Sequence, residues 1–347
     1  DKNILFTRDE ELTNYASDYT EDLVHLPQVV AKPTTVEQIS EILKFCTLNK
    51  IPVTPRGAGT GLSGGSLPVD GGISLSMENF NKILNIDEVN FQATVESGVI
   101  NEAFQQAVKA KGLFYPPDPA SKGSCFLGGN IAHSSGGPKA LKYGTTKDYV
   151  LNLQVVLPTG EILWTGADTL KNSTGYNLTQ LLIGSEGTLA VVTKIVFRLL
   201  PLPPNNLLML AKFQSIKDAC NAVPQLFTSG TSPSALELME RNAIDYVHKY
   251  ASASHTATTL SMTSSPSSAE IKAYLLIEVD GNAMDELFSQ CEQINEVLEA
   301  NNVIEVQFAD TAEQKEKLWH VRRSIGEMVK IHSIYKEEDA VVKRAHL

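Results

Sequence analysis

The sequence has 347 residues, a length that suggests two domains rather than one hydrophobic core. Hydrophobic residues make up 42% and charged residues 20%, and no stretch approaches the roughly 18 apolar residues that a membrane helix needs. The net charge of -11 disfavours nucleic acid and anionic membranes as partners, so a small anionic substrate would need a local cluster of Arg or Lys. The first residues show no signal-peptide pattern, and we expect a cytoplasmic protein, with peripheral association with a membrane left open.

The part of the chain before residue 201 is rich in glycine. Its apolar residues predict a short strand at 29–31, a helix at 35–49 and strands at 51–54, 73–77 and 93–95. They then predict a helix at 99–111, ended by Gly112, a hairpin of 151–157 with 161–164, and a long strand at 189–200.

The three prolines of Pro201-Leu202-Pro203-Pro204 can continue neither a helix nor a central strand, so we place a domain boundary there. After it, strands are predicted at 207–213, 273–279 and 303–308, and helices at 215–227, 283–300 and 311–331. This alternation suggests a sheet covered by helices on one face. Residues 252–268 lack periodicity and are predicted to form a mobile loop.

The four cysteines, at positions 46, 125, 220 and 291, are widely spaced and form no CxxC pair. This spacing argues against a disulfide framework and against a zinc or iron–sulfur site. Reduced, mostly buried thiols are therefore expected.

The strongest local motif is the segment 55–65, Pro-Arg-Gly-Ala-Gly-Thr-Gly-Leu-Ser-Gly-Gly. Because glycine occupies positions 57, 59, 61, 64 and 65, the chain can turn several successive N–H groups inward and form an anion nest suited to a pyrophosphate. Gly59–Gly64 formally matches GxGxxG, but residues 64–72 cannot form the helix that a Rossmann site requires, so a nicotinamide enzyme is disfavoured. An idle surface loop is also disfavoured, because so many glycines carry a large entropic cost.

Two further segments have the same character. Residues 116–121 and 127–137 combine prolines, glycine pairs and small polar residues, and residues 184–193 run from Gly-Ser-Glu-Gly-Thr into a strand. Three such pieces spread from residue 55 to residue 193 suit a long ligand such as a dinucleotide.

Together these three pieces resemble the FAD-binding domain of the vanillyl-alcohol oxidase and p-cresol methylhydroxylase superfamily. The resemblance is to the branch with glycolate oxidase flavoprotein subunits, D-lactate dehydrogenases and D-2-hydroxyglutarate dehydrogenases. It covers residues 25–203 strongly and 205–347 more loosely. It implies an α+β fold, with a two-subdomain FAD-binding domain at 1–204 and a ferredoxin-like cap domain at 205–347, incomplete at its C-terminal end relative to the family.

The resemblance also implies the residues that bind FAD. We expect non-covalent FAD, because some relatives attach the flavin through a His in the first loop and this loop holds none. For His133, two roles are left open: a contact with the flavin and a purely local role. The expected cofactor-binding residues are Arg56, Gly57, Ala58, Gly59, Thr60, Gly61, Leu62, Ser63, Gly64, Gly65, Pro117, Asp118, Ser121, Gly128, Gly129, Asn130, Ala132, Ser135, Gly136, Gly137, Glu186, Gly187 and Val191.

For the substrate carboxylate, the resemblance implies Arg322 on the last long helix, Lys336 and Arg344. A guanidinium can bind both carboxylate oxygens, although any one of these charges could instead be solvated. The family's His-x-Gly-Asp-Gly-Asn motif is missing from this sequence. We therefore name no catalytic base and no metal ligand, and a divalent metal would belong to a segment outside the sequence.

The function so predicted is FAD-dependent oxidation of a D-2-hydroxy acid of the lactate, glycolate or 2-hydroxyglutarate type to the 2-oxo acid. The alternative is a flavin-carrying subunit of an electron-transfer complex without a complete active site of its own. Expected partners are the hydroxy acid and an electron acceptor, which could be a quinone, a cytochrome, an electron-transfer flavoprotein or oxygen. A homodimer is compatible with the sequence.

Overall fold

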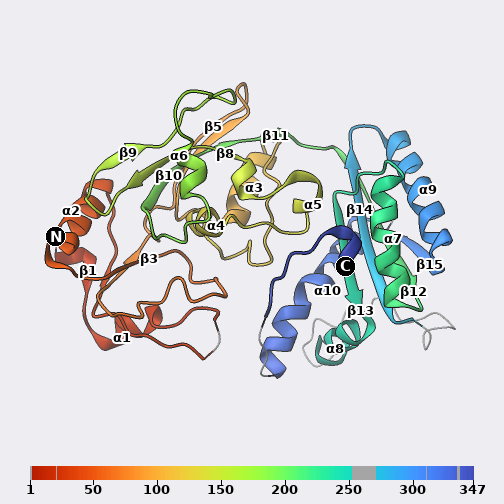
Figure 1. The fold of residues 1–347 in the computed structure, drawn as a ribbon, viewed down its shortest axis with the longest axis horizontal. Helices are drawn as coiled ribbons and strands as arrows, with labels where there is room; N and C mark the ends of the chain where they lie inside the picture. The colour runs from red at the N-terminus through yellow and green to blue at the C-terminus, as the bar shows by residue number, and fades with distance from the viewer. Residues whose placement is uncertain (1, 21, 252–270, 310, 334–336) are drawn as a thin grey trace. The chain divides into compact units, whose positions relative to one another are not determined.

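The computed structural model describes residues 2–20, 22–251, 271–309, 311–333 and 337–347 (Figure 1). They form two compact units of mixed helix and sheet. The first unit comprises Asp1–Gly137 and Gly144–Leu202, and the second comprises Pro138–Tyr143 and Pro203–Leu347. The second unit therefore takes in a short segment from the middle of the predicted first domain. The segment 252–268, predicted to be a mobile loop, lies outside the described residues.

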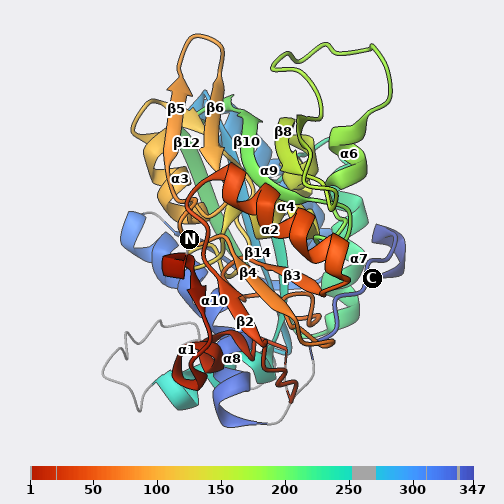
Figure 2. The same ribbon diagram turned by 90° about the vertical axis from the view of Figure 1, so that its left-hand side faces the viewer.

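The first unit contains a mostly parallel sheet with the strand order β1-β2-β4-β3. Helix α2 (Val36–Asn49) packs on it (Figure 2). Its residues Ile39 and Leu43 are buried against Leu75. The helix begins where Thr35 Oγ1 accepts a hydrogen bond from the backbone N–H of Gln38, which satisfies one free amide of the first turn. The strands are β1 (Leu5–Phe6), β2 (Val29–Ala31), β3 (Val53–Arg56) and β4 (Ile73–Ser76), and a short helix α1 (Asp9–Leu12) follows β1.

A second, antiparallel sheet of this unit has the order β5-β6-β10-β8-β9. Its central strand, β10, corresponds to the predicted strand at 189–200, and β8 pairs with β9 as the predicted hairpin. The strand β5 was not predicted from the sequence. The strands are β5 (Ile83–Asp87), β6 (Gln92–Glu96), β8 (Val150–Val156), β9 (Ile162–Trp164) and β10 (Val191–Arg198).

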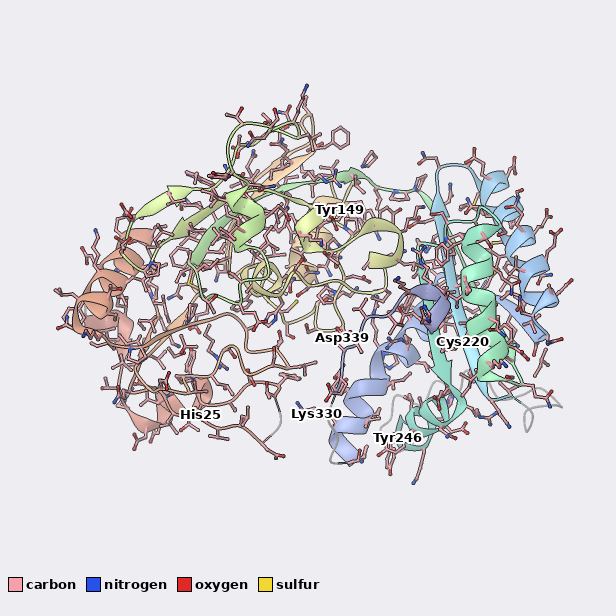
Figure 3. The ribbon with its side chains drawn as sticks, viewed as in Figure 1. His25, Tyr149, Cys220, Tyr246, Lys330 and Asp339 are labelled. Carbon is pink, nitrogen blue, oxygen red and sulfur yellow. The ribbon has the colours of Figure 1, made fainter. Side chains whose placement is uncertain are left out.

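Aromatic packing joins this sheet to the neighbouring helix. Tyr115 lies with its ring centroid 5.0 Å from that of Phe104, 4.8 Å from that of Phe197 and 5.9 Å from that of Tyr149. Tyr149 is labelled in Figure 3. Such tilted pairs add stability beyond their buried area and hold the chain entering residues 116–121. The remaining elements of the first unit are α3 (Asn101–Lys109), β7 (Leu113–Phe114), α4 (Leu127–His133), α6 (Leu178–Leu182) and β11 (Leu200–Pro201).

The second unit is built on one antiparallel sheet with the order β13-β14-β12-β15. This is the strand order of a β-α-β-β-α-β ferredoxin-like fold, as predicted. Strand β13 and helix α8 were not predicted from the sequence. The elements are α5 (Ala140–Tyr143), β12 (Asn205–Phe213), α7 (Ile216–Thr228), β13 (Ala235–Glu240), α8 (Arg241–Ala251), β14 (Ala273–Gly281), α9 (Met284–Ala300), β15 (Val303–Ala309) and α10 (Ala312–His332).

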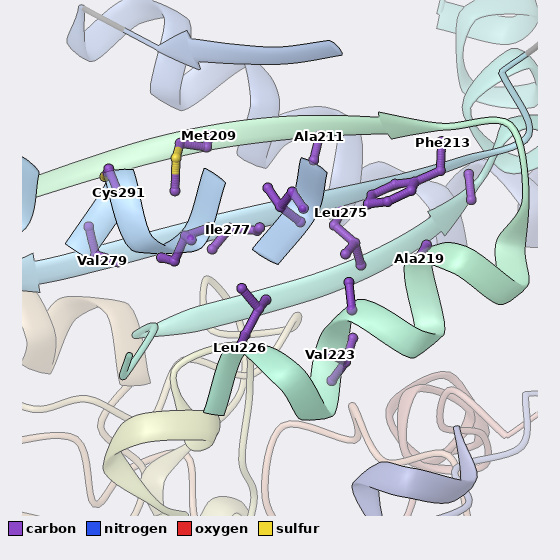
Figure 4. Close-up of a cluster of buried hydrophobic side chains, with 14 of the residues drawn as sticks. Met209, Ala211, Phe213, Ala219, Val223, Leu226, Leu275, Ile277, Val279 and Cys291 are labelled. Atoms are coloured by element: carbon purple, nitrogen blue, oxygen red, sulfur yellow. The ribbon is translucent and has the colours of Figure 1, made fainter. Parts of the chain in front are cut away.

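Helices cover both faces of this sheet, so the expectation of one covered face was wrong. On one face Leu275 and Ile277 pack with Val223 of α7 and Cys291 of α9 (Figure 4). On the other face Leu276 packs with residues of α8 and α10. Because β14 alternates buried residues toward both faces, its near-continuous apolar sequence already indicated two covered faces.

Candidate functional site

The first glycine segment is an irregular loop that follows β3. Among the described residues, no protein acceptor takes a hydrogen bond from the backbone N–H groups of residues 57–63. Gly59 has a φ of +71°, which side-chain-bearing residues rarely adopt. The loop continues through turns without a helix, as predicted. A run of available amides of this kind suits an anionic ligand.

The buried Arg56 lies beneath this loop. Its guanidinium donates to the backbone carbonyl of Ser17 at 2.8 Å and lies 5.4 Å from the ring centroid of Tyr15. A Cβ on Gly59 would come 2.5 Å from Arg56 Nη2, so the loop is closed tightly over the side chain. Burial lowers the pKa of Arg56, although the carboxylate of Asp18 opposes that effect. In this structure the side chain supports the loop from below.

Replacing Arg56 with methionine is expected to destabilise the protein by about 2–3 kcal/mol, because the backbone carbonyls that the buried guanidinium contacts would lose their charged donor. Urea unfolding measured by circular dichroism tests this. The control is Arg8→Met, since Arg8 forms an exposed ion pair with Glu11, and its unfolding midpoint should not change. An unchanged midpoint for the Arg56 variant would contradict the supporting role.

The second glycine segment contains α4. The amides of Leu127 and Gly128 donate to the carbonyls of Val99 and Ser97, which explains why a helix forms despite two glycines. A Cβ on Gly128 would lie 2.7 Å from Ser97 Cβ, whereas a Cβ on Gly129 would meet no protein atom within 4 Å. Gly128 therefore serves close packing, and Gly129 lies next to open space.

Polar side chains fix the prolines that precede α4. The buried Asn130 donates to Asn101 Oδ1 at 3.0 Å, and Asn101 donates to the carbonyl of Pro117 at 3.2 Å. A Cβ on Gly137 would lie 2.5 Å from the carbonyl oxygen of the buried Asp118, so these two segments touch. Asn130 and Asp118, both predicted cofactor contacts, are thus engaged in organising the chain around the loop.

The third glycine segment is bound to the end of α4. Gly184 donates its amide to the carbonyl of Ile131 and Glu186 donates to that of Ala132, both at 3.0 Å. Both donors have positive φ, which bends the segment at this point.

Other glycines lie close to residues of a different glycine segment. A Cβ on Gly57 would lie 3.8 Å from Gly129, and one on Gly61 would lie 3.5 Å from His133 Nε2. A Cβ on Gly65 would lie 3.5 Å from Glu186 Oε2, and one on Gly187 would lie 3.4 Å from the Pro55 ring. The structure therefore brings the three glycine segments together around one region, although they are far apart in the sequence.

A pocket of about 260 Å³ opens beside this region, lined by Pro55, Gly187 and Val191 together with apolar residues of α2 and β8. The available amides, the glycines without Cβ atoms and the adjoining pocket fit an extended nucleotide with a diphosphate bridge, as FAD has. The second segment also contains three further predicted cofactor contacts, Ser121, Ser135 and Gly136. The described contacts do not test their predicted role.

In the second unit the two described substrate cations, Arg322 and Arg344, have different partners. Arg322 of α10 donates from Nε to Glu237 Oε2 at 2.6 Å, on the face of the sheet that α8 and α10 cover. Arg344 lies 3.9 Å from the ring centroid of Phe227, a residue of α7. Lys336 lies outside the described residues.

A polar cluster that the sequence did not reveal occupies one end of β14. The buried carboxylates of Glu278 and Asp280 accept hydrogen bonds from Lys139, Lys142 and Tyr143. Burial raises the pKa of Asp280, but the Lys139 charge and the bonds from Lys142 and Tyr143 outweigh it and hold that pKa below its ordinary value. The alternation of β14 could have indicated two inward acidic residues at its end.

Metal ligands, membrane-spanning helices and disulfides were sought in the described parts of the chain. No group of three His, Cys, Asp or Glu residues there could hold a metal ion. No helix in those ranges is long and apolar enough to cross a membrane. The four cysteines are free thiols, of which Cys220 on α7 is only partly buried.

Comparison with known proteins agrees with this geometry. The model of an FAD binding domain matches residues 27–166, and the model of the C-terminal domain of FAD linked oxidases matches residues 202–347. The chain is 39% identical over 91% of its length to D-lactate dehydrogenase of Anaerostipes hadrus, of which it covers 65%. It is 38% identical over 96% of its length to glycolate oxidase subunit GlcD of Bacillus subtilis (strain 168), of which it covers 68%. It is 32% identical over 97% of its length to D-2-hydroxyglutarate dehydrogenase of Xanthomonas citri pv. viticola, of which it covers 69%.

Among solved structures, alkyldihydroxyacetonephosphate synthase matches 95% of this chain and 61% of its own at a TM-score of 0.76 and 19% identity, which supports the fold. The fold and the three glycine segments thus identify the chain as an FAD-binding domain followed by the C-terminal domain of an FAD-linked oxidase. The chain belongs to the family of FAD-linked oxidases that includes glycolate oxidase subunit GlcD. It spans about two thirds of the length of the curated relatives that it matches.

Proposed function

We propose that this protein binds FAD non-covalently at the three glycine segments and oxidises a D-2-hydroxy acid to the 2-oxo acid. The observation that carries the proposal is the convergence of these segments around amides that have no protein acceptor among the described residues. Relatives named for oxidation of lactate, glycolate and 2-hydroxyglutarate support the substrate class.

In this proposal the residues of the first unit hold the cofactor. The amides of residues 57–63 would receive the diphosphate, and the pocket beside Pro55 and Val191 would take the adenosine half. FAD, when bound, supplies the acceptor for the hydride that leaves the α-carbon of the substrate.

The second unit would supply the charge that binds the substrate. Arg322 is half-exposed and already holds a carboxylate, that of Glu237, at hydrogen-bonding distance. Its planar guanidinium can bind both oxygens of a substrate carboxylate and fix the α-carbon. Lys336 and Arg344 stay predicted contributors. The proposal includes an external electron acceptor, for which a quinone, a cytochrome, an electron-transfer flavoprotein and oxygen are the candidates, and a homodimer is to be tested by its mass in solution.

The purified protein should be yellow, and acid precipitation should release its flavin into the supernatant. Under anaerobic conditions one of D-lactate, D-2-hydroxyglutarate and glycolate should bleach the visible flavin absorbance within seconds, whereas L-2-hydroxy acids should not. Stopped-flow absorbance with each acid measures this. Bound flavin that no hydroxy acid reduces would contradict the substrate class and favour a flavin-carrying subunit of an electron-transfer complex. Failure to take up FAD would contradict the whole proposal.

A further inference from the structure

The segment Pro138–Tyr143 follows the glycine pair Gly136-Gly137 directly, yet it packs within the second unit. Two buried carboxylates at the end of β14 hold it there. Lys139 Nζ lies 2.7 Å from Glu278 Oε1, and Lys142 Nζ lies 2.6 Å from Asp280 Oδ1. Buried charges persist only when they are paired and hydrogen-bonded. The segment is therefore fastened at two points to the sheet that carries α10.

Glu278 makes a further contact that Asp280 does not make. Its Oε2 accepts a hydrogen bond from Trp319 Nε1 of α10 at 3.0 Å, while Oε1 also accepts from Asn206 Nδ2 of β12 at 2.9 Å. One buried carboxylate thus links the segment after the glycine pair, the central strand β12 and the helix α10. The three described side-chain donors to its carboxylate therefore come from three separate parts of the chain.

Trp319 lies three residues before Arg322, so both side chains project from neighbouring turns of one helix. A hydrogen bond to Trp319 opposes rotation and sliding of α10 and therefore restrains Arg322 as well. Lys139, the other partner of Glu278, is separated only by Pro138 from Gly136-Gly137, which are predicted to contact FAD.

We propose that Glu278 is a positioning residue that holds α10, and with it Arg322, in register with the chain that leaves the glycine segments. This inference rests on the proposed function, in which Arg322 binds the substrate carboxylate. Glu278 itself touches neither substrate nor cofactor in this proposal. Its effect is transmitted through Lys139 and Trp319.

The test is Glu278→Gln in the FAD-loaded protein with its full chain. The KM for the hydroxy acid that reduces the wild type should rise about tenfold, because a small displacement of a substrate-binding group is enough to cost this much. The flavin content and the kcat should change little. Lys139→Met should raise KM similarly, and the double variant should be no worse than the worse single variant, since both changes break one link.

A second readout does not depend on activity. The chain has 2 tryptophans, so in a Trp164→Phe background the fluorescence reports on Trp319 alone. Glu278→Gln should shift its emission to longer wavelength and increase its quenching by acrylamide, because the indole N–H loses its charged acceptor.

The matched control is Glu305→Gln. Glu305 pairs with the fully buried Lys212 at 3.0 Å on another strand of the same sheet, so its loss should lower the unfolding temperature without changing KM or Trp319 emission. If Glu278→Gln behaves as Glu305→Gln does in both readouts, the positioning role is wrong. If the wild type itself is reduced by no hydroxy acid, the proposed function fails and this inference fails with it.

Discussion

Replacing Gly129 with alanine is expected to weaken FAD binding by about 10- to 100-fold while leaving the fold intact. A Cβ at this position would meet no protein atom within 4 Å, so the protein alone accommodates it. Gly129 lies inside α4, and alanine there removes a glycine penalty of about 0.5–1 kcal/mol. The methyl group would enter the space that we propose for FAD. It would therefore destabilise the FAD-bound protein but not the flavin-free protein.

Two measurements separate these effects. Thermal unfolding of the flavin-free protein should show equal or higher stability for Gly129→Ala, and fluorescence titration with FAD should show the loss of affinity. Gly326→Ala is the matched control, because Gly326 also lies in a helix and its Cβ would also meet no atom within 4 Å. That variant should bind FAD as the wild type does. Wild-type affinity for FAD in Gly129→Ala would place the cofactor elsewhere.

Replacing Arg322 with methionine should lower kcat/KM for the hydroxy acid by about 100-fold or more, with FAD binding unchanged. The guanidinium would otherwise make charge-assisted hydrogen bonds to the substrate carboxylate, and methionine offers similar length without charge or donor. Arg322→Lys should recover only part of the loss, because an ammonium group cannot bind both oxygens in parallel. Steady-state kinetics with an artificial acceptor, together with the flavin absorbance of the purified variants, measure both quantities.

Lys317→Met serves as the control for this pair of variants. Lys317 lies on the same helix and forms an exposed i,i+4 ion pair with Glu313, so removing its charge should leave kcat/KM close to that of the wild type. An equal loss in Lys317→Met would mean that the general charge of α10 steers the substrate. Unchanged kinetics in Arg322→Met would remove Arg322 from the substrate site.

Elements with a strong, local residue pattern could be predicted from the amino-acid sequence alone. Helix α2 begins beside Thr35 as expected, and the hairpin of β8 and β9 and the helix–strand alternation after residue 205 all match. These elements are readable because caps, turns and alternation depend on neighbouring residues. The strand at 51–54 was shifted, since β3 runs from Val53 to Arg56 and includes a proline at a sheet edge.

In the cofactor region, some features could be predicted from the sequence and others depend on contacts between distant residues. The high glycine content of the segments 55–65, 127–137 and 184–193 is visible in the sequence, and it predicts close approach of a ligand to the backbone. That α4 forms at all depends on carbonyls of Ser97 and Val99, which accept from its first amides. Helix propensity alone disfavours two glycines in seven residues, and only long-range hydrogen bonds reverse that preference.

Charged residues were the least predictable, because their roles depend on partners far away in the sequence. No local sequence pattern marks Lys139 and Lys142, yet they pair with buried carboxylates of β14. Arg322 and Arg344, which the resemblance assigned to one substrate carboxylate, have different contacts: Arg322 pairs with Glu237 of β13, and Arg344 lies over the ring of Phe227 of α7. Local chemistry can be read along the chain, but which charges meet, and which face of a sheet they share, is decided only when distant strands pair and helices pack over them.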